Sequence, residues 1–263
     1  MQNPYIPVPA EITKIVKQTD IDYTFFVKSD MNLKSGQFVQ LSVPRAGEAP
    51  ISVSDFKDGE LEMTIRKVGK VTDEIFNKEI GDKLYIRGPY GNGFSPEDHY
   101  GKELILVAGG TGLAPVKNFI NHFYDNLDKL KSFRVIVGFK SMKDRLFVDE
   151  LNKWSQKFPV NITLDRPEEG WIGSTGFVTD HINKMLMKDM ENTHVVIVGP
   201  PPMMKFTALG FSKIGLKQEQ IWMSFERKMS CALGKCGHCK IDETYVCLEG
   251  PVFRYDKAVN LID

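Results

Sequence analysis

The sequence LILVAGGTGLAPV, residues 104–116, decides the fold of this chain. Its apolar first half predicts a buried parallel strand, and a glycine-rich turn then leads into a helix. Backbone amides at such a turn, together with the helix dipole, favour binding of a pyrophosphate. The pattern is G-G-T-G and not G-x-G-x-x-G, so a second interpretation stays open, in which the glycines only let the helix pack closely on the strand.

Strands and helices alternate from this turn towards the C-terminus. We expect strands at 103–108, 134–137, 160–164, 194–198 and 220–224, and helices at 114–124, 147–158, 179–187 and 203–214. This alternation predicts a doubly wound parallel sheet. A second turn, GPPPMM at 199–204, again joins a strand to a helix at the edge where α/β folds bind ligands, with Met203 and Met204 expected to pack.

The residues before this region predict a different architecture. Short strands are expected at 11–16, 23–27, 38–43, 51–55, 61–66 and 83–86, with one helix at 72–80. Six short strands separated by turn residues predict a small antiparallel barrel. We therefore predict a barrel domain over 1–98, a parallel-sheet domain over 99–224, and a C-terminal segment over 225–263 that is an appendage of the sheet.

Three stretches of the barrel half carry candidate binding residues. They are GEAPISVSD at 47–55, IRKVGKVT at 65–72 and GPYGNGF at 88–94. In the second, Thr72 either caps a helix or binds a phosphate, although an ordinary surface loop with solvated lysines is an equal alternative. The third either connects the domains or brings an aromatic side chain to a cofactor of the barrel.

All four cysteines lie within 17 residues near the C-terminus, with the spacing C-x4-C-x2-C-x7-C. The ligands predicted are Cys231, Cys236, Cys239 and Cys247. The first three match the plant-type spacing for a [2Fe–2S] cluster, and glycines inside the loop allow backbone amides to approach sulfur. A structural zinc site is the main alternative, although zinc ribbons usually pair two C-x2-C motifs.

Composition narrows the functional classes. Lys+Arg and Asp+Glu both number 34, which gives no support for binding to nucleic acid or to membranes. No run of 18 apolar residues occurs. Clustered cysteines without a signal peptide lead us to expect a cytoplasmic protein with reduced thiols.

These motifs together resemble the ferredoxin–NADP⁺ reductase superfamily. The cysteine pattern places the resemblance in the iron–sulfur flavoprotein branch, which includes the electron-transfer subunits of dihydroorotate dehydrogenase and the gamma subunits of soluble hydrogenases. Within that branch, VAGGTGLAPVK at 107–117, EQIW at 219–222 and FERKMSCALGKCGHC at 225–239 closely resemble the B subunits of anaerobic sulfite reductases. The resemblance spans the chain from about residue 5 to its end.

The resemblance implies that electrons pass from NADH to FAD, then to a [2Fe–2S] cluster and on to partner subunits. In the sulfite reductases these partners are a ferredoxin-like iron–sulfur subunit and a sirohaem catalytic subunit. The implied flavin-binding residues are Pro50, Ile51, Ser52, Val53, Ile65, Arg66, Lys67, Gly69, Val71 and Thr72. The implied nicotinamide-nucleotide residues are Gly109, Gly110, Thr111, Gly112, Gly199 and Pro200.

Three further expectations concern single positions. The superfamily usually has arginine where this chain has Ala49, so a charge-assisted bond to flavin phosphate is missing unless Arg45 or Arg66 replaces it. Glu226 is a candidate for a role on the nicotinamide side. Lys140 and Arg145 follow the second strand of the sheet, where an adenosine phosphate would lie, so NADPH stays open as an alternative to NADH.

Overall fold

The computed structural model describes residues 3–184 and 187–261, and it divides into two compact units. The first unit contains the residues up to Phe94 together with Ala114–Asn118 and Glu226–Val252. The second contains Ser95–Leu113, Phe119–Phe225 and the residues from Phe253 onward. The stretch Glu226–Val252, called the cysteine segment below, thus groups with the first unit and not with the parallel sheet that it follows in sequence.

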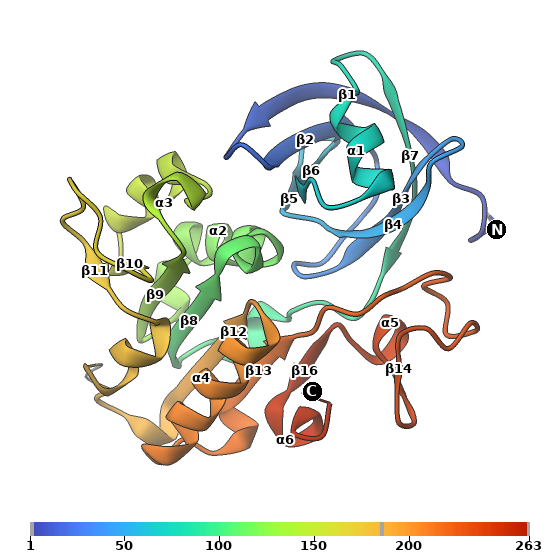
Figure 1. The fold of residues 1–263 in the computed structure, drawn as a ribbon. Helices are drawn as coiled ribbons and strands as arrows, with labels where there is room; N and C mark the ends of the chain where they lie inside the picture. Colours follow the sequence, from blue (N-terminus) through green and yellow to red (C-terminus); the bar gives the residue numbers. More distant parts are fainter. Residues whose placement is uncertain (1–2, 185–186, 262–263) are drawn as a thin grey trace. The chain divides into compact units, whose positions relative to one another are not determined.

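Seven antiparallel strands and one helix form the body of the first unit (Figure 1). They are β1 (Val8–Lys17), β2 (Asp22–Lys28), β3 (Phe38–Val43), β4 (Gly47–Ser52), β5 (Asp55–Lys57), β6 (Glu60–Arg66), α1 (Lys70–Phe76) and β7 (Lys83–Tyr90). The strand order is β4-β3-β7-β1-β2-β6-β5. β1 pairs with β7 over Val8–Glu11 and with β2 from Ile12 onward. A bulge between Ile12 and Lys14 interrupts the pairing with β2, which curves the sheet around its core.

The predicted barrel is confirmed, but with seven strands in the described residues instead of six. The segment predicted as one strand at 51–55 is divided between β4 and β5. The N–H of Val53 donates to Gln37 on one side, whereas the N–H of Ser54 donates to Glu62 on the other. The chain therefore changes partner strands at this point. The helix predicted at 72–80 is also shorter, since α1 ends at Phe76.

Alternating apolar side chains fill the barrel. Ile12, Val27, Leu41 and Leu61 have no exposed surface, and each comes from a different strand. Burial of side chains of this size contributes about 1.5–3 kcal/mol each. The core therefore fixes the strand register that carries the predicted binding segments.

The second unit is built on the predicted parallel sheet, in the order β11-β10-β9-β8-β12-β13-β16. Its strands are β8 (Glu103–Gly109), β9 (Ser132–Phe139), β10 (Val160–Leu164), β11 (Ser174–Thr175), β12 (Thr193–Val198) and β13 (Ile221–Ser224), with β16 (Val252–Arg254) at the edge. The α-helices are α2 (Lys117–Asp125), α3 (Val148–Ser155), α4 (Pro201–Lys213) and α6 (Tyr255–Ala258). Short 3₁₀ helices span Pro96–His99, Gly110–Val116, Leu127–Lys129, Met142–Asp144, Val178–Lys184, Met190–Asn192 and Gln218–Gln220.

Chain order reverses between β8 and β12, which pair in parallel from Thr193 and Glu103 to Val198 and Ala108. Sheets of this type bind ligands at the carboxyl ends of the strands where the order reverses. Both predicted nucleotide turns follow these two strands, and Figure 1 shows α4 lying over β12 and β13.

Two predicted helices differ from the structure. The stretch predicted as a helix from residue 114 begins as the 3₁₀ helix Gly110–Val116, because Pro115 has no N–H to donate, and becomes α2 at Lys117. The helix predicted at 179–187 is the 3₁₀ helix Val178–Lys184, and Met185 and Leu186 of that prediction lie outside the described residues. In the described residues, no helix has the length and apolar character to cross a membrane.

The cysteine segment has little regular structure of its own. It contains the two-residue strands β14 (Lys240–Ile241) and β15 (Thr244–Tyr245), which pair with each other, and the short helix α5 (Val246–Glu249). Its conformation therefore depends on side-chain and turn contacts more than on a sheet.

Candidate functional site

The first predicted flavin segment lies on the edge strand β4. Pro50, Ile51 and Ser52 are half-buried, so their exposed atoms can contact a ligand. Val53 differs, because its side chain is only 2% exposed and belongs to the barrel core. Ala49 is on the same strand and pairs with Leu41.

The second predicted flavin segment runs from β6 into α1. Arg66 donates Nε and Nη2 to the two carboxylate oxygens of Asp22, at 2.8 and 3.0 Å. Asp22 is fully buried and also accepts a bond from Thr19. A buried carboxylate that holds both arms of a guanidinium fixes its position, so Arg66 is an oriented cation at the end of β6.

Thr72 is committed to the turn before α1. Its hydroxyl accepts from the N–H groups of Val68 and Gly69 and donates to the carbonyl of Gly69. The N-cap residue of α1 is Gly69 and not Thr72, which closes the capping turn as the third residue of the helix; its phosphate role stays a prediction. Lys67 and Gly69 are exposed, Val71 is half-buried, and the side chain of Ile65 is in the core.

The G-G-T-G turn lies at the end of β8, where its glycines allow close packing. A Cβ on Gly112 would be 2.5 Å from the carbonyl oxygen of Val198 and 2.7 Å from the Cα of Gly199. Gly110 has a φ of +52°, in the left-handed region, with nothing near its missing side chain. Thr111 is half-buried at the start of this 3₁₀ turn. Gly112 thus requires glycine for packing, while Gly110 leaves backbone open to a ligand.

The second turn, after β12, meets the first at the reversal of chain order. Gly199 is buried and Pro200 is exposed. Met203 on α4 covers both turns, since its side chain would contact a Cβ on either Gly109 or Gly199. Met203 is therefore a packing residue, as predicted.

The four cysteines form two pairs. The thiols of Cys231 and Cys236 hydrogen-bond to each other, and so do those of Cys239 and Cys247. Cys236 is exposed, whereas Cys239 and Cys247 are 2% and 1% exposed. Within the described part of the chain, no three His, Cys, Asp or Glu side chains are arranged to hold one metal ion. Two pairs of thiols fit a cluster of two irons, in which each iron takes two protein ligands.

Backbone amides point at these sulfurs. The N–H groups of Leu233, Lys235 and Cys236 donate to Cys231 Sγ at 3.3–3.4 Å. The N–H of Gly234 donates to Cys247 Sγ at 3.3 Å, and Gly234 has a φ of +66°. Such amides stabilise thiolates and tune the potential of an iron–sulfur cluster, so the donor set fits that group.

One thiol of each pair has a shifted pKa. N–H groups of His238 and Cys231 lower the pKa of Cys236 to about 7. Burial raises the pKa of Cys247 to about 12. Cys236 is therefore the more easily ionised and the more accessible of these two thiols, whereas Cys247 is enclosed.

Glu226 begins the cysteine segment in the first unit. Desolvation by the surrounding protein raises the pKa of its carboxyl group, and the charge of Arg66 opposes this shift. The charge of Arg66 thus acts on two carboxylates: it pairs with Asp22, and it opposes the rise in the pKa of Glu226.

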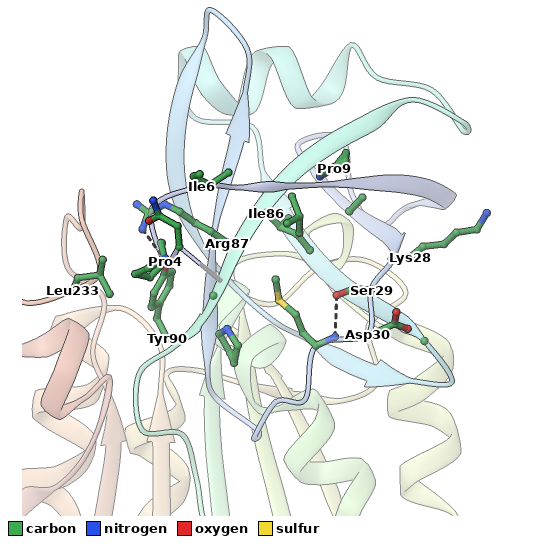
Figure 2. Close-up of a pocket in the computed structure, with 17 residues that line it drawn as sticks. Pro4, Ile6, Pro9, Lys28, Ser29, Asp30, Ile86, Arg87, Tyr90 and Leu233 are labelled. Carbon is green, nitrogen blue, oxygen red and sulfur yellow. Dashed lines mark hydrogen bonds between the residues drawn. The ribbon is translucent and has the colours of Figure 1, made fainter. Parts of the chain in front are cut away.

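A cavity of about 930 Å³ opens on the first unit, beside the start of the cysteine segment (Figure 2). Its lining includes Arg87, Tyr90 and Leu233. None of the residues named as flavin or nicotinamide ligands lines it, but Gly88, Pro89 and Tyr90 of the candidate stretch GPYGNGF do.

Sequence reasoning missed two groups of residues. Lys117, on the stretch that follows the G-G-T-G turn, forms a buried ion pair with Glu62 of β6. Arg87 and Asn92 bind main-chain carbonyls of the cysteine segment. The motif GPYGNGF contains Asn92 and directly follows Arg87, so it marked this stretch of the sequence. Nothing in the motif indicated that these residues bind the cysteine segment.

Three protein families match successive parts of the chain. "Oxidoreductase FAD-binding domain" matches residues 11–94, and "Oxidoreductase NAD-binding domain" matches residues 106–208. "Iron-sulfur cluster binding domain of dihydroorotate dehydrogenase B" matches residues 226–259. The predicted FAD, NAD and iron–sulfur cofactors are thereby confirmed.

Relatives match over nearly the whole chain. The gamma subunit of sulfhydrogenase 1 of Pyrococcus furiosus is 34% identical over 98% of this chain and 94% of its own length. A probable electron transfer subunit of dihydroorotate dehydrogenase B (NAD(+)) from Methanocaldococcus jannaschii is 30% identical, over 95% of this chain and 91% of its own length.

A solved structure supports the same assignment. The NADH-dependent reduced ferredoxin–NADP oxidoreductase, described in connection with flavin-based electron bifurcation, is 28% identical with a TM-score of 0.79. The similarity covers 95% of this chain and 91% of that one. The predicted arrangement of a flavin barrel, a nicotinamide domain and an iron–sulfur segment is confirmed, and the chain is an oxidoreductase subunit.

Proposed function

The chain belongs to the ferredoxin–NADP⁺ reductase-like family of FAD- and NAD-binding proteins, with an iron–sulfur domain of the dihydroorotate dehydrogenase B type, and we propose a function on this basis. We propose that it oxidises NADH as the electron-transfer subunit of a multi-subunit reductase. The observation that carries the proposal is the presence of all three binding domains on one chain. A nicotinamide delivers electrons in pairs and an iron–sulfur cluster takes them singly, and a bound flavin exchanges both.

We propose that the residues of the first unit hold the flavin in an oriented way. Pro50, Ile51 and Ser52 offer the half-buried surface of β4, and Arg66 offers a cation held in place by Asp22. Thr72 keeps the turn before α1 closed, which fixes where Gly69 and Val71 lie. This side-chain order lowers the entropic cost of binding.

In the second unit, Gly109, Gly110, Thr111 and Gly112 are proposed to bind the nicotinamide nucleotide. Gly110 exposes backbone at the start of a helical turn, which suits a pyrophosphate. Gly199 and Pro200 form the neighbouring turn across the reversal point, where the other part of the nucleotide would lie.

The cysteine segment is proposed to hold a [2Fe–2S] cluster as the exit for electrons. Cys239 and Cys247, which are buried, would hold its enclosed end, and Cys231 and the exposed Cys236 would hold the end nearer to solvent. Because Cys236 is exposed, a partner can approach that end of the cluster closely. The segment shares a compact unit with the flavin barrel, which keeps donor and acceptor in one body.

For the partner subunits we propose a ferredoxin-like iron–sulfur subunit and a sirohaem subunit that reduces sulfite. The support is the resemblance of FERKMSCALGKCGHC and the other motifs to the B subunits of anaerobic sulfite reductases. The sulfhydrogenase and dihydroorotate dehydrogenase relatives support a hydrogenase or a dihydroorotate dehydrogenase subunit as the alternative partner.

Anaerobic purification with cofactor analysis tests the electron-transfer function. We expect about two irons, two sulfides and one FAD per chain, with flavin and iron–sulfur absorption both bleached by NADH. Cys247→Ser should lose the cluster and keep reduction of the flavin by NADH. A colourless protein that contains zinc would contradict the proposal and support a zinc-stapled nucleotide-binding module.

Comparison of NADH with NADPH tests the coenzyme. Arg145 donates to the carbonyl of Met142 and lies 5.3 Å over the ring of Trp171, so its guanidinium already has two contacts near the end of β9. We expect kcat/KM to be higher for NADH, and Arg145→Met to change the ratio little. A clear preference for NADPH that is lost in Arg145→Met would contradict this.

Affinity capture of the tagged holoprotein from its own cells tests the partners. NADH-dependent reduction of sulfite to sulfide by the captured complex is the expected result. NADH-linked hydrogen turnover or dihydroorotate oxidation would instead assign one of the two alternatives.

A further inference from the structure

Arg87 of β7 makes five hydrogen bonds although it is only 7% exposed. Two of these bonds go to the Glu48 carboxylate, from Nε at 2.9 Å and from Nη2. Nη1 also donates to Tyr90 Oη at 2.9 Å and to the Cys231 carbonyl at 2.8 Å. Nη2 also donates to the Ser230 carbonyl at 3.0 Å. A guanidinium has five N–H groups, so each has a partner. Figure 2 shows Arg87 with Tyr90 and Pro4, beside Leu233 of the cysteine segment.

The two carbonyls that Arg87 binds belong to the first cluster ligand and to the residue before it. Residues 87 and 231 are 144 positions apart, so this contact defines where the cysteine segment starts on the barrel. The carbonyl of Met229, one residue earlier, accepts from Gln40 Nε2 of β3 at 3.4 Å. Three successive carbonyls ahead of the cluster loop are thus bound by barrel side chains.

Asn92 binds the other end of the segment. Its Nδ2 donates to the carbonyls of Glu249 and Val252 at 2.8 and 2.7 Å, and its Oδ1 accepts from the Val252 N–H at 3.1 Å. The N–H of Asn92 also donates to the carbonyl of Gly250 at 2.7 Å. These bonds begin two residues after the last cysteine, Cys247.

Both anchors come from one stretch of chain. Arg87 is in β7 and Asn92 is two residues beyond its end, while the strand itself pairs with β1 and β3 in the middle of the barrel order. The Glu48 partner of Arg87 lies on β4, the strand that carries Pro50–Ser52. The same guanidinium therefore connects the proposed flavin strand with the first cluster ligand.

We propose that Arg87 and Asn92 are positioning residues, together called the β7 clamp, which fix the two ends of the cysteine segment on the flavin barrel. The clamp uses main-chain carbonyls and leaves the cysteine sulfurs to the cluster. It therefore positions the four ligands whether or not the cluster is bound. It rests on the proposed function only in taking this segment as the cluster carrier.

Hydrogen exchange on the purified holoprotein tests the clamp directly. Arg87→Lys keeps a charge for Glu48 but cannot span two carbonyls, so it loses at least one charge-assisted bond to the segment. A bond of that kind corresponds to about tenfold or more in an opening equilibrium. We expect amides in 229–236 to exchange about tenfold faster or more, with β1 and β6 unchanged, and iron to be lost faster to a chelator.

Glu48→Gln is the matched variant for the charge pair. It leaves the carbonyl bonds of Arg87 in place, so exchange in 229–236 should stay within about twofold of wild type. Arg254→Met removes an arginine whose carboxylate partner is Asp256, and it should leave the segment unchanged. Equal acceleration in Arg87→Lys and Glu48→Gln, or none in Arg87→Lys, would overturn the proposal.

Asn92→Ala tests the other end and decides the question if Arg87→Lys does not fold. Faster exchange confined to 247–252 supports the clamp, and unchanged exchange there overturns it. Asn126→Ala, which removes a side-chain bond to the carbonyl of His122 in the second unit, is its control. The iron, sulfide and flavin contents of the wild type are measured in parallel. A protein without these groups would refute the proposed function, and the exchange rates would still test whether Arg87 and Asn92 fix the ends of the cysteine segment.

Discussion

Gly112→Ala is the substitution that best tests how the nucleotide turn is built. The added Cβ would be 2.5 Å from Val198 O and 2.7 Å from both Val198 C and Gly199 Cα. Ordinary contacts between such atoms need about 3.5 Å, so the turn must move by about 1 Å away from β12. All three are backbone atoms, two of them in β12 in the middle of the sheet and one in the turn that follows it, so they cannot give way as a flexible side chain would.

The expected cost follows from this displacement. Overpacking of this kind destabilises by about 1–3 kcal/mol, which corresponds to a fall in melting temperature of roughly 2–12 °C at about 2–4 °C per kcal/mol. A misplacement of about 1 Å at a binding constellation can also cost about 10²-fold in rate. We therefore expect both a lower melting temperature and a large loss in the rate at which NADH reduces the flavin.

Two other glycines provide the controls. Gly110→Ala adds a Cβ in open space at a φ of +52°, so its free energy of unfolding should fall by only the strain of a left-handed residue, about 1–2 kcal/mol, even though it lies in the proposed nucleotide site. Gly101→Ala, with a φ of +70° and open space outside the turn, should cost similar stability and leave the NADH rate unchanged. Thermal unfolding and stopped-flow reduction by NADH measure both effects. A Gly112→Ala protein with wild-type melting temperature and an NADH rate within twofold of wild type would refute the packing argument.

Three further predictions concern the first unit. Lys117→Met removes the ammonium group that pairs with Glu62 in a site where the two side chains are 6% and 8% exposed, so the free energy of unfolding should fall by about 3–5 kcal/mol. The double variant Lys117→Met/Glu62→Leu should recover most of that loss. A cost below about 1 kcal/mol for the single variant in thermal unfolding would speak against this prediction. Burial acts to raise the pKa of Glu48, but hydrogen bonds from Arg87 and Ser42 outweigh burial and hold that pKa below the usual 4.5. This carboxylate therefore contributes stability that is fully present above about pH 4.5 and is lost as the pH falls through the lowered pKa. The melting-temperature difference between wild type and Glu48→Gln should therefore shrink below about pH 4, and a constant difference from pH 3 to 7 would exclude this linkage. Ala49→Arg should bind FAD about 10- to 100-fold more tightly in titrations of the apoprotein, because it adds one charge-assisted bond of about 1.5–3 kcal/mol, and an unchanged affinity would count against a role for this position.

The sequence predicted best what depends on neighbouring residues. The apolar run before Gly109 and the glycines after it are local signals, and the structure has a buried strand and a tight turn there. The division of 51–55 into two strands was not predictable in this way. It depends on the carbonyls of Gln37, just before β3, and of Glu62 in β6, which accept from successive N–H groups.

Placement of the cysteine segment is the largest difference between the sequence prediction and the structure. Because the segment follows β13 directly, sequence order favoured an appendage of the parallel sheet. Its ends are instead bound by Arg87 and Asn92, which lie more than 140 positions earlier in the chain. Contacts between side chains and main-chain carbonyls at that separation leave no periodic pattern in either segment, so no local signal could have shown them.

Arg66 has a structural role beside the one predicted for it. The family resemblance implies that Arg66 binds the flavin, and in the structure its charge balances Asp22, which has no exposed surface. An arginine held by a buried carboxylate loses little further freedom when an anion approaches, whereas Arg45 lies exposed on a turn with a φ of 69°. With 35% of its side chain exposed, Arg66 can still meet such an anion. The geometry therefore favours Arg66 over Arg45 as the cation that replaces the arginine missing at position 49, at the cost of sharing its charge with Asp22.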